Sequence, residues 1–418
     1  MTRWLTVAGA AWAVALVSVA GQPGRPSFQG TLDQHPAIDY RWTDPADPVA
    51  RLQADLAAGA VTLAFDGQQG YLRSLLSALH VPVESQVLLF SKTGVQHAFT
   101  NPQNPRALYF NDRVVVGYIP GAPVIEIASH DPRQGVMFYT LRQDAAAVAF
   151  ARPSACLTCH LSANSMDVPG ILVRSMFTGP DGRTMPQLGS FLVDHRSPLK
   201  QRWGGWYVVG SHGAARHMGN AMVTDPSNPE AAISEATLNR AVLDAQVAAA
   251  AYPIPSSDIA ALMVFDHQGH ALNLLTRLGW ETRIAMAESR LDFAGGELRE
   301  LVNETADYLL FVDEARLDAP VRASSAFATV FAAAGTRDSL GRSLRDFDLA
   351  TRLFRYRCSY MIQSPAFDGL PAEARAALVA RLRAILSGGV ADPRYTSFTA
   401  GEREAVLAIV RETVKGWS

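Results

Sequence analysis

The stretch VVVGYIPGAPVIEIASHDPRQGVMFYTL, residues 114–141, decides the fold class of this chain. It holds three short runs rich in valine, isoleucine, phenylalanine and tyrosine, which are residues typical of strands. The sequences PGAP and HDPRQG separate the runs and carry the proline, glycine and aspartate of tight turns. A similar run, QVLLF, occupies residues 86–90. We therefore expect a small antiparallel sheet in the N-terminal part of the chain.

Helical patterns lie on both sides of this region. They cover residues 49–59 and 70–79 before it, and residues 233–252, 259–283, 345–362, 373–386 and the stretch from Thr399 onward after it. A strand is also expected at residues 206–210, WYVVG. The fold class is therefore α+β. We divide the chain into a signal segment (1–20), a mixed N-terminal region (21–145), a middle segment (146–225) and a mainly helical C-terminal region (226–418).

The first 20 residues have the pattern of a secretory signal peptide. Arg3 supplies a positive charge, residues 4–20 form an uncharged and mostly apolar run, and Ser18 and Ala20 are the small residues of a cleavage site. An uncleaved membrane anchor is the alternative, although spanning a bilayer needs about 20 apolar residues. We predict an exported protein, located in the periplasm or otherwise outside the cytoplasm, with no transmembrane span after cleavage.

Charge and cysteine content exclude two classes of protein. The formal net charge of −2 disfavours a nucleic-acid partner, which usually requires a strongly basic face. Three cysteines are too few for the disulfide scaffold of an exported protein, so a hydrophobic core must stabilise the fold. Cys358 stands alone in a helical pattern and is expected to be a buried free thiol.

Two of the three cysteines stand in the sequence CLTCH, as Cys156 and Cys159, followed directly by His160. This spacing arises by chance in roughly one of two thousand chains of this composition. It suits covalent haem, because two thiols can bond the vinyl groups on one porphyrin edge while the histidine binds the iron. A zinc site, a dithiol redox pair and a local disulfide or buried pair remain alternatives.

The CLTCH sequence resembles the haem-binding motif of c-type cytochromes, and the resemblance covers residues 156–160. It implies one covalently bound haem c, attached through Cys156 and Cys159, with His160 as the proximal axial ligand of the iron. Outside the motif the chain departs from the small carrier proteins of that family. Residues 146–225 are therefore interpreted as a haem c segment, placed between the sheet and the helical region.

The sixth ligand of the iron has several candidates downstream of the motif. Residues 202–222 combine aromatic side chains with the candidates Met218, His212 and His217. His267 lies on the helix predicted over 259–283, and Met185 precedes a proline, as distal methionines of small cytochromes do. Met218 is the first choice among the five.

The function expected from these patterns is electron transfer by an exported c-type cytochrome, with redox proteins as partners. The chain is much longer than the roughly 100 residues of a small domain. A haem-dependent oxidoreductase of the peroxidase or oxygenase type, or a haem-based redox sensor, is therefore the alternative, with a small molecule as substrate or ligand. No catalytic residue is predicted from the sequence.

Overall fold

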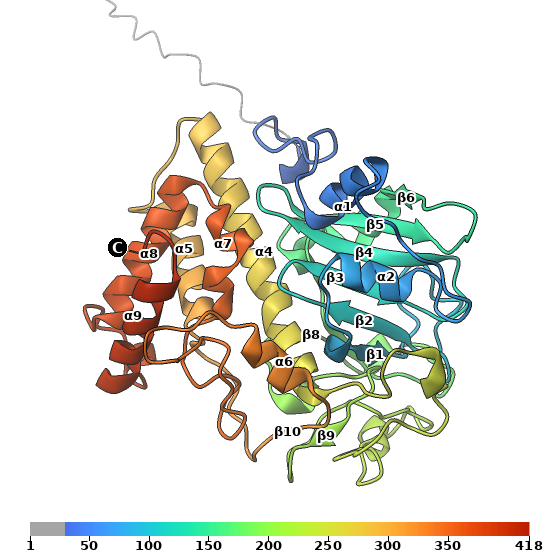
Figure 1. Cartoon of the computed structure of the whole chain (residues 1–418). Coiled ribbons are helices and arrows are strands. Elements are labelled where there is room, and N and C mark those ends of the chain that lie inside the picture. Colours follow the sequence, from blue (N-terminus) through green and yellow to red (C-terminus); the bar gives the residue numbers. More distant parts are fainter. Residues whose placement is uncertain (1–29, 418) are drawn as a thin grey trace, which may run out of the picture. The chain divides into compact units, whose positions relative to one another are not determined.

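A six-stranded antiparallel sheet forms the framework of the N-terminal half (Figure 1). The computed structural model describes residues 30–417. The strands pair in sequence order, so each one joins its neighbours in the chain. They are β1 (Val87–Leu89), β2 (Arg106–Phe110), β3 (Val114–Tyr118), β4 (Val124–Asp131), β5 (Gly135–Arg142) and β6 (Phe150–Ala151). The antiparallel sheet predicted from the sequence is confirmed, while β2 and β6 were not predicted.

Both faces of this sheet are buried. Because successive residues of a strand point to opposite faces, Tyr109 packs with Val116 on one face while Phe110 points to the other. The helices α1 (Pro48–Ala57) and α2 (Leu72–Ala78) cover the first face. Both were predicted from their apolar periodicity. The second face contributes to the core that surrounds the long helix described next.

The helix α4 (Ile259–Ala287) lies between the sheet and the C-terminal helices (Figure 1). It is buried on almost every side, and its apolar residues are spread around the helix instead of forming one stripe, with polar side chains such as Asp266, His267 and Asn273 buried among them. Asp258 caps its first turn, where its side chain accepts hydrogen bonds from the N–H groups of Ala260 and Ala261. The same carboxylate accepts hydrogen bonds from the backbone N–H groups of Ser324 and Ser325, at 2.8 and 2.7 Å.

The remaining helices and ladders complete the described part of the chain. The helices are α3 (Leu157–His160), α5 (Gly296–Leu309), α6 (Phe327–Ala333), α7 (Pro365–Asp368), α8 (Ala372–Leu386) and α9 (Ala400–Thr413). The short ladders pair β7 (Arg174–Met176) with β8 (Ser190–Leu192), and β9 (Gly210–Ser211) with β10 (Arg322–Ala323). The α+β class is confirmed, including α8, α9 and the mainly helical C-terminal half. The strand predicted at 206–210 is wrong except for its last residue.

The helix predicted over residues 233–252 is wrong, because this segment consists of turns, bends and one short 3-10 helix, Ala249–Ala251. Asn239 has a φ of 52°, and the carbonyl of Arg240 accepts a hydrogen bond from the N–H of Gly210 at 2.8 Å. Leu243 is buried in the core against the sheet. Tertiary contacts therefore outweigh the local helix propensity of this alanine-rich stretch.

The helix predicted over residues 345–362 is also wrong. Leu349 has a φ of 54°, and the side chain of Asp348 closes a turn by accepting a hydrogen bond from the N–H of Ala350 at 2.7 Å. Such aspartate turns compete with a helix for the backbone donors. The segment still buries Cys358 completely, and the prediction of a buried free thiol is confirmed.

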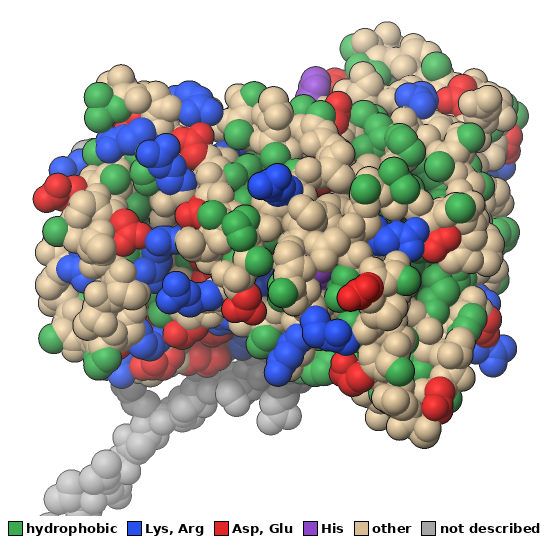
Figure 2. All heavy atoms as spheres, turned by 90° about the horizontal axis from the view of Figure 1, so that it is seen from below, with side chains coloured by type: hydrophobic (Ala, Val, Ile, Leu, Met, Phe, Trp, Pro, Cys, Tyr) green, Lys and Arg blue, Asp and Glu red, His purple; other side chains and the backbone are tan. Residues whose placement is uncertain are grey.

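The outer surface carries charges of both signs. On the face seen in Figure 2, lysine and arginine side chains alternate with aspartate and glutamate side chains and do not form one basic area. Within residues 30–417, no helix is long and apolar enough to cross a membrane. The predicted signal peptide, residues 1–20, lies outside the described residues.

Candidate functional site

The haem segment places both motif cysteines on one short helical stretch. A turn of 3-10 helix, Ser154–Cys156, continues directly into α3. Cys156 is half-buried and Cys159 is exposed, and neither forms a disulfide. Cys156 and Cys159 are less than one helical turn apart, so their thiols lie on the same side of this stretch. Attachment of haem c requires two thiols on one side, because each thiol bonds one of the two vinyl groups on the same porphyrin edge.

Gly170 clamps His160 through two hydrogen bonds. The His160 Nδ1 lies 2.8 Å from the carbonyl oxygen of Gly170, and the Gly170 N–H donates to the His160 carbonyl at 2.9 Å. A Cβ atom at residue 170 would lie 2.3 Å from the Asn273 side-chain oxygen, so a glycine is needed here. Asn273, on α4, in turn holds both backbone groups of Ile171, at 2.9 and 2.8 Å.

This clamp determines which ring nitrogen of His160 is available. A carbonyl can only accept, so Nδ1 carries the proton and Nε2 keeps its free lone pair. Burial lowers the pKa of His160, which favours the neutral imidazole that binds metal ions. The ring packs on Phe138 of β5, with ring centroids 4.9 Å apart. Groups behind the ring thus fix the orientation and the tautomer of His160.

A cavity of about 270 Å³ adjoins the motif. It is lined by Tyr40, Arg41, Trp42, Phe138, Arg152, Pro153, Ser154 and Leu157. Phe138 thus contacts both this cavity and the His160 ring, and Trp42 is 83% exposed. The aromatic side chains suit the faces of a porphyrin, while Arg41 and Arg152 are cations that can bind its two propionates. The lining therefore holds side chains of the types that contact a porphyrin, while Cys156, Cys159 and His160 are not among its residues.

The other interpretations of the motif find less support. Within residues 30–417, no three histidine, cysteine, aspartate or glutamate side chains lie together as a possible metal site, whereas a structural zinc ion needs four ligands. A reactive dithiol has a lowered thiol pKa at the start of a long helix. Here burial and then Glu126 raise the pKa of Cys156, and α3 has four residues.

The two candidate ligands His212 and His217 contact each other inside the protein. Their Nε2 atoms are 3.1 Å apart, and the Nδ1 of His217 accepts a hydrogen bond from the Gly219 N–H at 3.0 Å. The His212 Nε2 also accepts from the Asn239 N–H at 3.0 Å. Both nitrogens of His217 are therefore used within the core.

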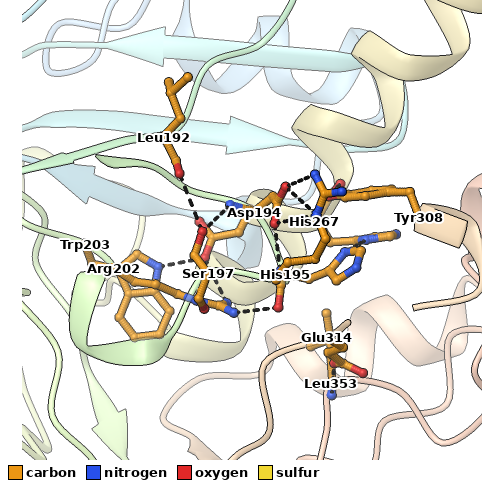
Figure 3. A network of polar contacts seen from close by, with 12 residues as sticks. Leu192, Asp194, His195, Ser197, Arg202, Trp203, His267, Tyr308, Glu314 and Leu353 are labelled. Atoms are coloured by element: carbon orange, nitrogen blue, oxygen red, sulfur yellow. Dashed lines mark hydrogen bonds and ion pairs between the residues drawn. The ribbon is translucent and has the colours of Figure 1, made fainter. Parts of the chain in front are cut away.

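His267 is enclosed in the same way (Figure 3). Its Nδ1 lies 2.8 Å from the Nδ1 of His195, and its Nε2 lies 2.6 Å from the Ser359 hydroxyl. The ring stacks on Tyr308 with centroids 5.3 Å apart. Burial lowers the pKa of His267 to about 3, so the ring is neutral and hydrogen-bonded.

The two candidate methionines share one small core cluster. Met218 is buried there, and its sulfur accepts a hydrogen bond from the Ser175 hydroxyl at 3.5 Å. Met185 is half-buried and packs against the same cluster. Within residues 30–417, no hydrogen bond, ion pair or ring contact joins any of the five candidate ligands to residues 156–160.

Sequence reasoning missed a buried polar network beside the His267 ring (Figure 3). Asp266 accepts hydrogen bonds from Trp203 at 3.0 Å and from Arg202 at 3.3 Å, and Arg202 also donates to the His195 carbonyl at 2.9 Å. Burial raises the pKa of Asp266 to about 7. The carboxylate of Asp266, directly after the seven apolar residues 259–265, was the available signal. Gly170, Asn273 and Phe138 were missed as well, because they meet His160 only in the folded chain.

Comparison with known proteins assigns this chain to no family. No protein-family model matches this chain, and the searches of curated proteins and of solved structures found no match.

Proposed function

We propose that this chain is an exported c-type cytochrome that carries one covalent haem and transfers electrons. The observation that carries the proposal is the clamp on His160, which frees Nε2 beside two unbonded cysteines on the same helical stretch. Cys156 and Cys159 would hold the porphyrin edge, and His160 would bind the iron. When bound, haem supplies one-electron redox chemistry at its iron.

The position of the motif supports electron transfer. Cys159 is exposed, and the exposed indole of Trp42 lines the adjoining cavity. A cofactor bonded there would have one edge close to the protein surface, where a redox partner can approach. Arg41 and Arg152 lie at the same cavity and can bind anionic groups of the cofactor or of that partner.

The first experiment is an ultraviolet-visible spectrum of protein produced in a host that attaches haem c. We expect absorbance that remains with the chain after denaturation and disappears when both Cys156 and Cys159 are replaced by serine. The Cys358→Ala variant is the matched control and should keep the haem. A denatured wild-type chain that carries no haem would refute the proposal.

One observation favours the alternative of a haem enzyme or sensor. His217 and His267 use both ring nitrogens within the protein, His212 uses its Nε2 only, and Met218 accepts a hydrogen bond at its sulfur. An iron with that position open binds external ligands. Carbon monoxide added to the reduced protein separates the two functions: an unchanged low-spin spectrum supports an electron carrier, and a shifted high-spin spectrum supports the enzyme or sensor.

A further inference from the structure

A second cavity lies outside the haem segment, between the sheet and the helical half of the protein. Its volume is about 420 Å³, within the size range of small-molecule sites. It is lined by His80, Pro82, Phe110, Asn111, Asp112, Arg113, Gln268, Phe327, Val330, Phe331, Ala334 and Arg345. These residues come from the β2–β3 turn, from α4, from α6 and from the loop after it. Figure 1 shows α6 beside the end of α4 at which that helix begins.

The apolar part of the lining is aromatic. Phe327 lies between two other rings, 5.8 Å from Phe110 and 5.5 Å from Phe331 between centroids. All three phenylalanines are at least nine-tenths buried. The Phe327 ring is tilted by 50° to Phe110 and by 30° to Phe331, so the three rings form an uneven apolar wall that an aromatic ring can meet edge-on.

Most polar groups of the lining are already paired within the protein. Gln268 donates to the Asn111 carbonyl at 2.7 Å and accepts from the Tyr360 hydroxyl at 2.7 Å. The guanidinium of Arg345 forms an ion pair with Asp112 and lies over the Phe331 ring, 4.7 Å from its centroid. These groups shape the cavity and are not available as strong partners for a ligand.

Arg113 is the exception. Arg113 lines the cavity, yet its guanidinium makes no hydrogen bond or ion pair with any residue in the range 30–417, and its Nε is shielded from solvent. Arg113 is half-buried; burial and then the Arg51 charge lower its pKa, and the carboxylates of Asp47, Asp131 and Asp112 act in the opposite direction. With Arg345 and Asp112, the cavity carries two positive charges and one negative charge. The excess of one positive charge matches a single anionic group.

We infer that this cavity binds a small aromatic monocarboxylate, with the carboxylate on Arg113 and the ring against the three phenylalanines. Arginine presents two parallel donors that fit a carboxylate, and the pairing is strong where water is excluded. The inference does not rest on the presence of haem, because this cavity shares no lining residue with the cavity beside the CLTCH motif.

Calorimetric titration of the full chain with benzoate, hexanoate and benzamide tests the inference. Benzoate should bind saturably, and benzamide, which has the same shape without the charge, should bind at least about tenfold more weakly. The titration is repeated on protein with and without haem, and it should give the same result in both. Hexanoate binding as tightly as benzoate would refute the aromatic preference.

Three variants locate the site. Arg113→Gln should weaken benzoate at least about tenfold, to the level of benzamide, without lowering the thermal unfolding temperature, because Arg113 has no protein partner. Ala334→Trp should block all three compounds by filling the cavity. Arg411→Gln, an exposed arginine on α9, is the matched control and should change nothing. No saturable benzoate binding, or an Arg113→Gln variant that binds benzoate like the wild type, would overturn the inference.

Discussion

At the scale of single residues, Gly170 joins the haem segment to the core of the protein. It exchanges hydrogen bonds with His160 and leaves no space for a side chain beside Asn273. Neither property can be seen in the sequence, where Gly170 is one of many glycines. The motif residues could be predicted because they are adjacent in the chain, whereas the groups that orient His160 come from α4 and β5.

The Gly170→Ala substitution tests this connection. We expect it to lower the free energy of unfolding by about 1–3 kcal/mol, because the new methyl group must displace Asn273 or the His160 carbonyl contact. Denaturant unfolding measures the loss, and the haem spectrum should change with it. Gly401→Ala, at an open site in α9, is the control and should be neutral or slightly stabilising. Equal effects of the two substitutions would argue against the clamp.

Glu314 gives a prediction about pH. Burial raises its pKa to about 7, above the value of 4.5 in an unfolded chain, while one oxygen accepts a hydrogen bond from the Leu353 N–H at 2.8 Å. The folded state therefore favours the protonated form, so its contribution to stability is complete below pH 4.5 and is lost as the pH rises through 7.

In consequence, Glu314→Gln should stabilise the protein by about 1–3 kcal/mol at pH 8 and have little effect at pH 4. Unfolding curves at the two pH values measure this difference. Glu235→Gln, at an exposed position, serves as the control and should show no such dependence. A Glu314→Gln variant that is less stable than the wild type at pH 8 would contradict the raised pKa of Glu314.

At the scale of elements, the sequence predicted those whose local signals agree with their tertiary contacts. The helices α1, α2, α4, α8 and α9 are rich in apolar and helix-forming residues, and α9 also has its capping box. The residues 233–252 and 345–362 have similar helix propensity but give their backbone hydrogen bonds to distant groups and turns. The strand β2 was missed because its five residues begin with an arginine and carry little alternation.

Asp258 connects two elements, because it caps α4 and also accepts hydrogen bonds from Ser324 and Ser325, just before α6. We expect Asp258→Ala to lower the free energy of unfolding by about 2–4 kcal/mol, because backbone N–H groups of two segments lose their acceptor. Thr399→Ala removes an ordinary cap, that of α9, and should cost about 1 kcal/mol. Chemical denaturation compares the two, and equal losses would mean that the contacts to Ser324 and Ser325 contribute nothing.

At the scale of the whole molecule, the three cysteines should differ in reactivity. Burial raises the pKa of the Cys358 thiol to about 12, whereas Cys156 and Cys159 are accessible in the chain without haem. We predict that iodoacetamide adds two groups to the native chain without haem and a third only in denaturant. Mass spectrometry counts the groups. Haem-loaded native protein should take up none, and alkylation of Cys358 in the folded protein would contradict the buried position.

The contact between Asn273 and Ile171 has a consequence for maturation. The two residues are 102 positions apart, so the support behind His160 is complete only after α4 has joined the sheet. A chain that emerges N-terminus first presents the CLTCH sequence well before that helix is available. The attachment machinery would therefore meet the motif as a pliable peptide, and the closing of the core afterwards would orient the imidazole that the peptide alone leaves free to rotate.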